Sequence, residues 1–209
     1  MAGLDELRDA VMAGDADRTV KLTQDAIEGA APPDEILNGM VAAMDEVGRR
    51  FQCGNAFVPE MLFASRAMRA GLALLEPILV QEGIKPEVTA VIGTVQGDLH
   101  DLGKDLVVMM WKGANFEVID LGIDVSADRF IKAIKKHKAQ IVGLSTLLTT
   151  TMSNMEATVQ AIKETKLNHV KTIVGGAPVS QQFADVIGAD AYGPDAVAAV
   201  DIARKLTMG

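Results

Sequence analysis

The stretch VTAVIGTVQGDLHDLG, residues 88–103, joins a β-branched run to a glycine-bounded loop and predicts a buried strand that leads into a helix. Four further strand-like runs follow it, at residues 116–122, 140–146, 171–177 and, more weakly, 189–193. Helical stretches lie between them, near 102–112, 126–137, 152–165, 180–187 and 194–206. Five βα units of this length predict one parallel sheet with helices on both faces and right-handed crossovers.

The part of the chain before this sheet shows only helical periodicity. Its apolar residues recur at a spacing near 3.6, and none of its runs alternates like a strand. Glycines end the first three of four short helices, the third of them before Gly48, and Pro33 lies in the first turn of that third helix. The segment EGIKPE then interrupts the pattern. We therefore predict a helical bundle over residues 1–82, a linker over 83–87 and an α/β domain over 88–209.

The composition argues against nucleic-acid and membrane-surface partners. Of the 209 residues, 49% are hydrophobic and 23% are charged, which is ordinary for a globular protein. The formal net charge of -8 repels phosphate backbones and anionic lipid headgroups. Most of the excess acidity lies in residues 1–87, which carry 8 basic and 15 acidic side chains.

Targeting and redox features predict a cytoplasmic protein. The N-terminus lacks the basic and apolar regions of a secretory signal, and no apolar run approaches the roughly 20 residues that span a bilayer. The single cysteine, Cys53, can form neither an internal disulfide nor a CxxC pair, which fits a reducing compartment.

The candidate ligand-binding residues gather at one predicted edge of the sheet. Ligands of open α/β sheets bind beyond the carboxyl ends of the strands, where strand order reverses. Asp98 and His100 leave the first strand there, and a carboxylate can hold one imidazole nitrogen while the other binds a metal. A lone loop histidine can equally be a solvated or capping residue, and we interpret His137 and His169 in that way. Because one histidine holds a bare ion poorly, the metal would bring its own macrocycle.

Three separately placed motifs make a family resemblance specific. In chain order they are Asp98-x-His100-x-x-Gly103, 41 residues later Ser145-x-Leu147, and 27 residues after that Gly175-Gly176. This pattern resembles the cobalamin-binding signature of methyltransferase corrinoid proteins and of the corresponding module of methionine synthase. Residues 48–77 are similar to the helical cap segment of that family. The fold implied is α/β, with an N-terminal four-helix bundle cap before a flavodoxin- or Rossmann-like five-stranded sheet.

The resemblance implies that cobalamin binds base-off and His-on, with its dimethylbenzimidazole tail in a slot of the α/β domain. His100 is then the metal ligand, and Asp98 and Thr151 continue a relay from its imidazole. Phe51, Val58 and Met61 match the apolar cap over the upper face of the cofactor. The other residues implied to contact the cofactor are Gly97, Leu99, Asp101, Gly103, Ser145, Leu147, Thr149, Gly175, Gly176 and Ala196.

Purely structural roles stay open for several of these residues. In the family the glycines would leave room for the nucleotide tail, and Ser145 would donate a hydrogen bond to a ring nitrogen. The glycines can instead serve only to turn the chain between strand and helix, and the threonines can be loop and N-cap residues. Phe51, Val58 and Met61 can also be core residues of the bundle.

The function implied is that of a methyl carrier that is not a complete enzyme by itself. The resemblance implies three partners: a substrate-specific methyltransferase that loads the corrinoid, a second methyltransferase that unloads it to tetrahydrofolate or coenzyme M, and a reductive activator. Two alternatives stay open, the cobalamin-binding subunit of an adenosylcobalamin mutase and a cobalamin-based sensor or regulator. If the motif were misleading, a flavodoxin-like receiver domain would remain.

Overall fold

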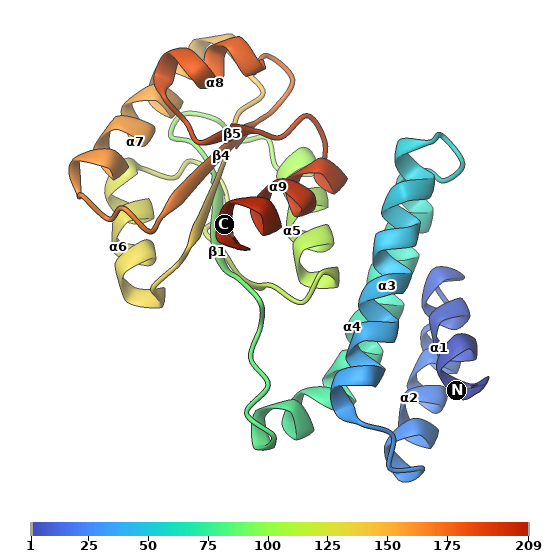
Figure 1. The fold of residues 1–209 in the computed structure, drawn as a ribbon. Coiled ribbons are helices and arrows are strands. Elements are labelled where there is room, and N and C mark those ends of the chain that lie inside the picture. The colour runs from blue at the N-terminus through green and yellow to red at the C-terminus, as the bar shows by residue number, and fades with distance from the viewer. Residues whose placement is uncertain (1, 209) are drawn as a thin grey trace. The chain divides into compact units, whose positions relative to one another are not determined.

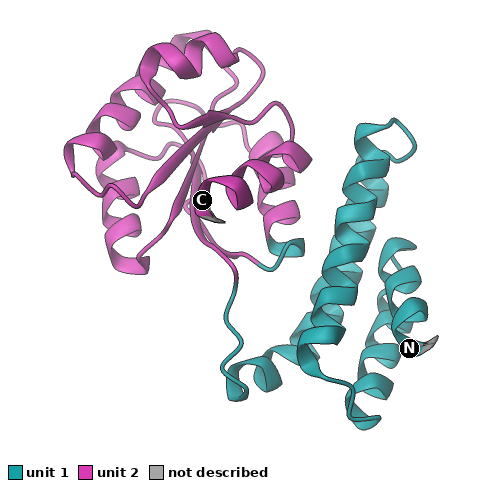
Figure 2. Ribbon diagram, viewed as in Figure 1, with its two compact units in different colours: residues 1–86, 112–115 teal, residues 87–111, 116–209 magenta. Residues whose placement is uncertain are grey.

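The computed structural model describes residues 2–208, and the chain divides into two compact units (Figure 2). Unit 1 comprises Met1–Pro86 with Lys112–Asn115, and unit 2 comprises Glu87–Trp111 with Phe116–Gly209. Residues 1 and 209, the outer ends of the two predicted domains, lie outside the described residues.

Helices alone make up the first part of the chain, and strands alternate with helices in the rest (Figure 1). The helices are α1 (Ala2–Met12), α2 (Ala16–Glu28), α3 (Pro33–Gln52), α4 (Val58–Gln81), α5 (Leu102–Gly113), α6 (Ala127–His137), α7 (Met152–Glu164), α8 (Gln181–Ile187) and α9 (Ala196–Met208). The strands are β1 (Thr89–Thr94), β2 (Glu117–Asp120), β3 (Ile141–Ser145), β4 (Lys171–Gly175) and β5 (Ala191–Tyr192), and a 3-10 turn, η1 (Thr149–Thr151), precedes α7.

The four helices of unit 1 pack their apolar stripes against one another. The largest fully buried side chains of this bundle come from α1, α3 and α4: Leu7, Ile36, Met40, Met44, Met61, Met68 and Leu75. Helix α2 adds two buried hydroxyls, those of Thr19 and Thr23, each bonded to the backbone oxygen four residues earlier. Most of these core side chains are methionine or leucine, which are long, not β-branched and favourable in helices.

Helix α3 is longer than its sequence predicts. We expect it to end before Gly48, but it runs through that residue to Gln52. A single glycine costs a helix only about 1 kcal/mol, and Glu46 accepts hydrogen bonds from Arg49 and Arg50 across the same turn. The hydrogen bonds from these two arginines lower the pKa of Glu46 to about 2.

The sheet of unit 2 has the strand order β2-β1-β3-β4-β5, and every neighbouring pair is parallel. Strand order reverses between β1 and β3, because the chain moves from β1 outward to β2 and then returns to the other side of β1. This is the flavodoxin-like arrangement. The predicted fold class, a helical bundle followed by a five-stranded parallel sheet, is confirmed.

Helices cover both faces of the sheet. Helices α6, α7 and α8 lie on one face, and α5 and α9 lie on the other (Figure 1). On each face, a helix side chain packs closely against a glycine of a central strand. A Cβ on Gly93 would meet Phe130 of α6 at 2.9 Å, and one on Gly143 would meet Trp111 of α5 at 2.9 Å. The two large aromatic side chains, both fully buried, thus pack directly on strand backbone.

The register of the parallel strands decides which loops meet. Thr94, at the end of β1, is aligned with Ser145 at the end of β3, and Ser145 is aligned with Gly175 at the end of β4. The chain therefore leaves these three strands at one level, beside the reversal of strand order.

Candidate functional site

A buried carboxylate, that of Asp98, lies at the centre of this edge and is 0% exposed. Its Oδ1 accepts a hydrogen bond from the backbone N–H of His100 (3.0 Å) and lies 2.7 Å from Nδ1 of the same residue. Its Oδ2 accepts from the backbone N–H of Leu147 (2.6 Å) and from the hydroxyl of Thr146 (2.8 Å). One carboxylate thus joins the loop after β1 to the loop after β3.

Asp98 determines how the imidazole of His100 is held. A carboxylate only accepts hydrogen bonds, so Nδ1 carries a proton. Thr94 fixes the backbone of the same residue, because its Oγ1 donates to the His100 carbonyl oxygen at 2.8 Å. The His100 side chain is 51% exposed, and no hydrogen bond to its Nε2 occurs within residues 2–208. In the neutral ring Nε2 can therefore present its lone pair to a metal.

Two buried hydroxyl groups, those of Thr146 and Thr151, lie beside the Asp98 carboxylate. Thr151 Oγ1 lies 3.3 Å from Asp98 Oδ2, whereas Thr146 Oγ1 lies at 2.8 Å and is itself 2.6 Å from Thr151 Oγ1. The Thr146 hydroxyl donates its one proton to Asp98. Its oxygen therefore accepts the hydrogen bond from the Thr151 hydroxyl. Thr146 therefore lies between Asp98 and Thr151, the two residues that sequence analysis paired. The sequence signal for it was weak, since a threonine directly after a strand is more often a simple turn residue.

The hydrogen bonds to Asp98 lower its pKa by more than burial raises it. Burial raises the pKa of this carboxyl, but the N–H groups of Leu147 and His100, the His100 ring and the Thr146 hydroxyl hold the pKa well below its usual range. Asp98 is therefore ionised across the physiological pH range, and it holds a permanent negative charge against the imidazole.

Asp98 is expected to make the stability of the protein decrease in acid. Because the folded-state pKa is depressed, Asp98 stabilises the fold fully above its unfolded pKa of about 4, and this contribution is lost as pH falls through the folded pKa. Between these two values the free energy of unfolding should fall by up to about 1.4 kcal/mol per pH unit more steeply than in Asp98→Asn. Urea titrations of both proteins at several acid pH values measure the two slopes. Equal slopes would contradict this role of Asp98.

Asp124 holds the start of the same loop from the segment after β2. Its Oδ1 accepts from the backbone N–H of Gly97 at 2.7 Å, and its own N–H donates to the Asp98 carbonyl oxygen at 3.1 Å. Gly97 has a φ of +85°, in the left-handed region that favours glycine, and Asp124 has a φ of +50°. Asp124 was not predicted as a site residue, because an isolated aspartate between a strand and a helix forms no motif.

Exposed apolar side chains lie on the segments that leave the sheet at the same edge as His100. Leu99 and Leu102, on either side of it in sequence, are 67% and 82% exposed. Ile123, Leu147 and Leu148, from the loops after β2 and β3, are exposed as well. Such a group of apolar side chains marks a binding surface for an apolar ligand. Leu99 and Leu147 were predicted site residues, whereas the other three were not, because single apolar residues beside a strand normally indicate core.

Other predicted cofactor residues also lie near this edge of unit 2. Ser145, the last residue of β3, is half-buried, and Thr149 and Asp101 are exposed. Gly103 lies in the first turn of α5, where an added Cβ would meet no atom within 4 Å. Ala196 is the first residue of α9 and is buried. Their contacts with a cofactor stay predictions.

The Gly175-Gly176 pair is required by the fold itself. A Cβ on Gly176 would lie 1.8 Å from the carbonyl oxygen of Thr146, and the backbone φ of Gly176 is +124°. A Cβ on Gly175 would lie 2.9 Å from the carbonyl oxygen of Gly193. Close backbone packing thus accounts for both glycines, and the additional role of leaving room for a nucleotide tail stays a prediction.

The predicted cap residues belong to unit 1. Phe51 in the last turn of α3 and Val58 at the start of α4 are half-buried, while Met61 is fully buried in the bundle core. Phe57 and Phe63, which sequence analysis did not select, are the more exposed apolar side chains near the start of α4. A cap role for Phe51, Val58 and Met61 stays a prediction, and the burial of Met61 shows that it is also a core residue.

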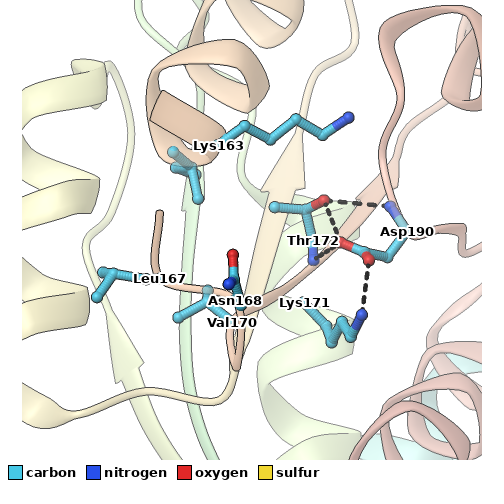
Figure 3. A pocket seen from close by; sticks show the side chains of 8 residues that line it. Lys163, Leu167, Asn168, Val170, Lys171, Thr172 and Asp190 are labelled. Atoms are coloured by element: carbon cyan, nitrogen blue, oxygen red, sulfur yellow. Dashed lines mark hydrogen bonds and ion pairs between the residues drawn. The ribbon is translucent and has the colours of Figure 1, made fainter. Parts of the chain in front are cut away.

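A cavity of about 300 Å³ lies at the opposite edge of the sheet, between the end of α7 and the start of β4 (Figure 3). Three of its polar side chains are paired with one another: Asp190 accepts from the side chains of Lys171 (3.2 Å) and Thr172 (2.9 Å). None of the predicted site residues lines it. We therefore place the candidate site around Asp98 and His100 and not at this cavity.

Residues 2–208 contain no group of three or more His, Cys, Asp or Glu side chains that could hold a metal ion. They also contain no helix that is both long and apolar enough to cross a membrane.

Comparisons with known proteins match both parts of the chain. Residues 88–201 and residues 4–76 each match a family described as B12 binding domain. A dimethylamine corrinoid protein of Methanosarcina barkeri is 42% identical over 207 residues, covering 97% of this chain and 96% of that protein. A corrinoid protein of Desulfitobacterium hafniense strain Y51 is 38% identical over 211 residues, covering 99% and 98%.

Solved structures agree with these matches. A cobalamin-binding protein from Desulfitobacterium hafniense DCB-2 has a TM-score of 0.82 and 31% identity, covering 97% of this chain and 98% of that one. The methanol:cobalamin methyltransferase complex from Methanosarcina barkeri has a TM-score of 0.84 and 27% identity, covering 100% and 80%. The predicted resemblance and the predicted cofactor, cobalamin, are confirmed. The chain therefore belongs to the family of B12-binding corrinoid proteins.

Proposed function

We propose that this protein is a corrinoid methyl carrier that binds cobalamin base-off and His-on, with His100 as the lower axial ligand. The observation that carries the proposal is the pair of His100 and Asp98. A fully buried carboxylate holds Nδ1 at 2.7 Å, and the exposed ring leaves Nε2 free for the metal. Bound cobalamin would supply a cobalt centre that accepts and donates a methyl group.

The residues around this pair give the ligand its properties. Asp98 keeps the Nδ1 proton in place and raises the basicity of Nε2. Thr146 and Thr151 hold the second oxygen of Asp98 and extend the hydrogen-bonded chain away from the imidazole. We propose the order His100, Asp98, Thr146, Thr151 for the relay. A proton taken up by the relay would make His100 an imidazolium paired with the ionised Asp98, whose charge these two hydroxyls stabilise.

The surface around His100 fits a large apolar macrocycle. The five exposed aliphatic side chains Leu99, Leu102, Ile123, Leu147 and Leu148 come from three loops at one edge of the sheet. Burying them under a corrin ring would add a hydrophobic contribution that a bare metal ion cannot provide. Residues 2–208 contain no group of three or more His, Cys, Asp or Glu side chains that could hold a bare ion, so the fit favours a metal that carries its own ring.

Gly103 offers a test of the space required by the cofactor. Replacing it by alanine is expected to stabilise the protein without cofactor by up to about 1 kcal/mol, because alanine favours a helix and the added Cβ meets nothing. If the nucleotide tail passes there, the same change lowers cobalamin affinity by about tenfold. Urea titration and equilibrium dialysis measure the two effects. Unchanged affinity would show that the tail does not pass close to Gly103.

The proposed partners are two methyltransferases and a reductive activator. One methyltransferase would load the corrinoid from a methylated donor, and the other would unload it to tetrahydrofolate or coenzyme M. Support comes from relatives that are named trimethylamine and dimethylamine corrinoid proteins, and from the similar chain in the methanol:cobalamin methyltransferase complex. The donor used by this chain would be set by its loading methyltransferase.

The first experiment is reconstitution of the purified protein with hydroxocobalamin and, separately, with methylcobalamin. We expect binding of one cofactor per chain and an absorption spectrum of the base-off, His-on form. Transfer is then measured by adding each methyltransferase purified from the same cells, with tetrahydrofolate or coenzyme M, and following loss of the methylcobalamin spectrum. Failure to retain either cofactor, or a base-on spectrum, would overturn the proposal, and selective binding of adenosylcobalamin would favour the mutase alternative.

A further inference from the structure

A lysine is buried beside the loop that carries His100. Lys104 lies in the first turn of α5, and its side chain is only 2% exposed. Both circumstances are unfavourable for a cation, because burial removes its water and the N-terminal end of a helix carries partial positive charge. A lysine in a position that is unfavourable for these two reasons needs a compensating interaction.

Two carboxylates compensate this charge. Lys104 Nζ donates to Asp120 Oδ2 at 2.8 Å and to Oδ1 at 3.0 Å, and it also bonds the Asp105 carboxylate. Burial lowers the pKa of Lys104, but the hydrogen bonds to Asp105 and Asp120 outweigh it and raise the pKa above its ordinary value. The ammonium group therefore stays charged within a paired network.

The network joins the start of α5 to the end of β2. Asp120 is the last residue of β2, and its position is set by pairing with Ile92 of β1. Its Oδ1 also accepts from the Gly122 N–H at 2.9 Å, so the carboxylate is oriented before it meets the lysine. Lys104 thus ties the first turn of α5 to a strand end that is itself fixed in the sheet.

The ion pair between Lys104 and Asp120 determines where the loop with His100 ends. The loop leaves β1 at Thr94 and enters α5 at Leu102, two residues before Lys104. Its start is already held by Asp124, through the Gly97 N–H and the Asp98 carbonyl oxygen. Both ends of the loop are therefore anchored on the segment from Asp120 to Asp124, which contributes nothing to the metal itself.

We propose that Lys104 is a positioning residue for His100: the ion pair between its buried ammonium group and Asp120 fixes the end of the loop and so keeps the imidazole on Asp98 with Nε2 free for a metal. The inference rests on the proposed role of His100 as axial ligand. It adds a residue from outside the predicted site. It also gives a role to the buried charge of Lys104, which would otherwise only lower the stability of the fold.

The test compares Lys104→Met with Lys135→Met, which removes an exposed lysine from α6. The first readout needs no cofactor: 15N nuclear magnetic resonance of the imidazoles, of which the chain has only three. In the wild type and Lys135→Met we expect His100 as a single Nδ1–H tautomer with a slowly exchanging proton. In Lys104→Met we expect mixed tautomers and rapid exchange. The second readout is cobalamin affinity with its spectrum, where we expect a loss of about 10- to 100-fold and a smaller His-on fraction.

A second pair of variants covers the case in which Lys104→Met does not fold. Asp120→Asn leaves Lys104 with Asp105, and the double variant Lys104→Met, Asp120→Asn also removes the Asp120 carboxylate that Lys104→Met leaves without its lysine partner. We expect the double variant to fold but still to show the mixed tautomers of His100. A folded variant without Lys104 that keeps the wild-type tautomer and wild-type cobalamin affinity would overturn the inference.

The outcome separates this inference from the proposed function. If the wild type binds cobalamin without a His-on spectrum, the proposed role of His100 fails, whatever the Lys104 variants do. If the wild type is His-on and the folded variants without Lys104 are equally so, only the positioning role fails. If the wild type is His-on and these variants lose both the tautomer and the His-on fraction, both hold.

Discussion

Replacing His100 by alanine is expected to abolish the His-on spectrum and to lower cobalamin affinity by roughly 100-fold. The physical reason is that the site has one free imidazole nitrogen, and the surrounding aliphatic side chains cannot donate a lone pair to cobalt. Equilibrium dialysis gives the affinity, and the absorption spectrum of the same samples gives the ligation state.

The matched control is His169→Ala, which removes an exposed histidine just before β4, at the opposite edge of the sheet. This variant should bind cobalamin like the wild type. Added imidazole should restore a nitrogen-ligated spectrum to His100→Ala, because a free imidazole can occupy the space left by the ring. An unchanged spectrum in His100→Ala would show that another group ligates the metal, and the proposed function would then lose its central residue.

The second large effect is expected at Gly176. Alanine there should lower the free energy of unfolding of unit 2 by about 3–5 kcal/mol. Its Cβ would lie 1.8 Å from the Thr146 carbonyl oxygen, so the loop after β3 would have to move, and the φ of +124° is itself strained for alanine. Because Thr146 also donates to Asp98, the variant should lose His-on binding as well.

Gly122→Ala is the control for the backbone conformation alone. Gly122 lies in unit 2 with a φ of +79°, but an added Cβ would meet no atom within 4 Å. It should therefore cost only about 1 kcal/mol. Urea titrations followed by a probe of unit 2 compare the two variants. Similar costs would mean that the loop after β3 adapts easily, and that Gly176 is not held against Thr146.

The fold was predictable because its signals are local. The βα repeats after residue 88 follow from alternating β-branched and helical stretches, and the observed α6 and α7 lie close to their predicted ranges. The end of α3 was wrong for a physical reason: one glycine is a weak stop signal, and the ion pairs of Glu46 with Arg49 and Arg50 carry the helix past Gly48.

The candidate site was predictable only in part. Asp98 and His100 are two residues apart, so their hydrogen bond is a local event that spacing alone can predict. The hydroxyl closest to Asp98 is 48 residues away, on Thr146, and the carboxylate that pairs with Lys104 is 16 residues away, on Asp120. Neither residue belongs to a motif that reasoning from one sequence could recognise.

Periodicity, the positions of glycine and proline, and the short Asp98-x-His100 spacing were thus enough to predict the sheet, the bundle and the contact between Asp98 and His100. The further partners of Asp98 depend on the alignment of Thr94 with Ser145 across two parallel strands. They depend equally on the edge position of β2, which places Asp120 and Asp124 beside the loop. Such contacts arise because strand register brings together residues far apart in the chain, and no local pattern in either segment encodes that register.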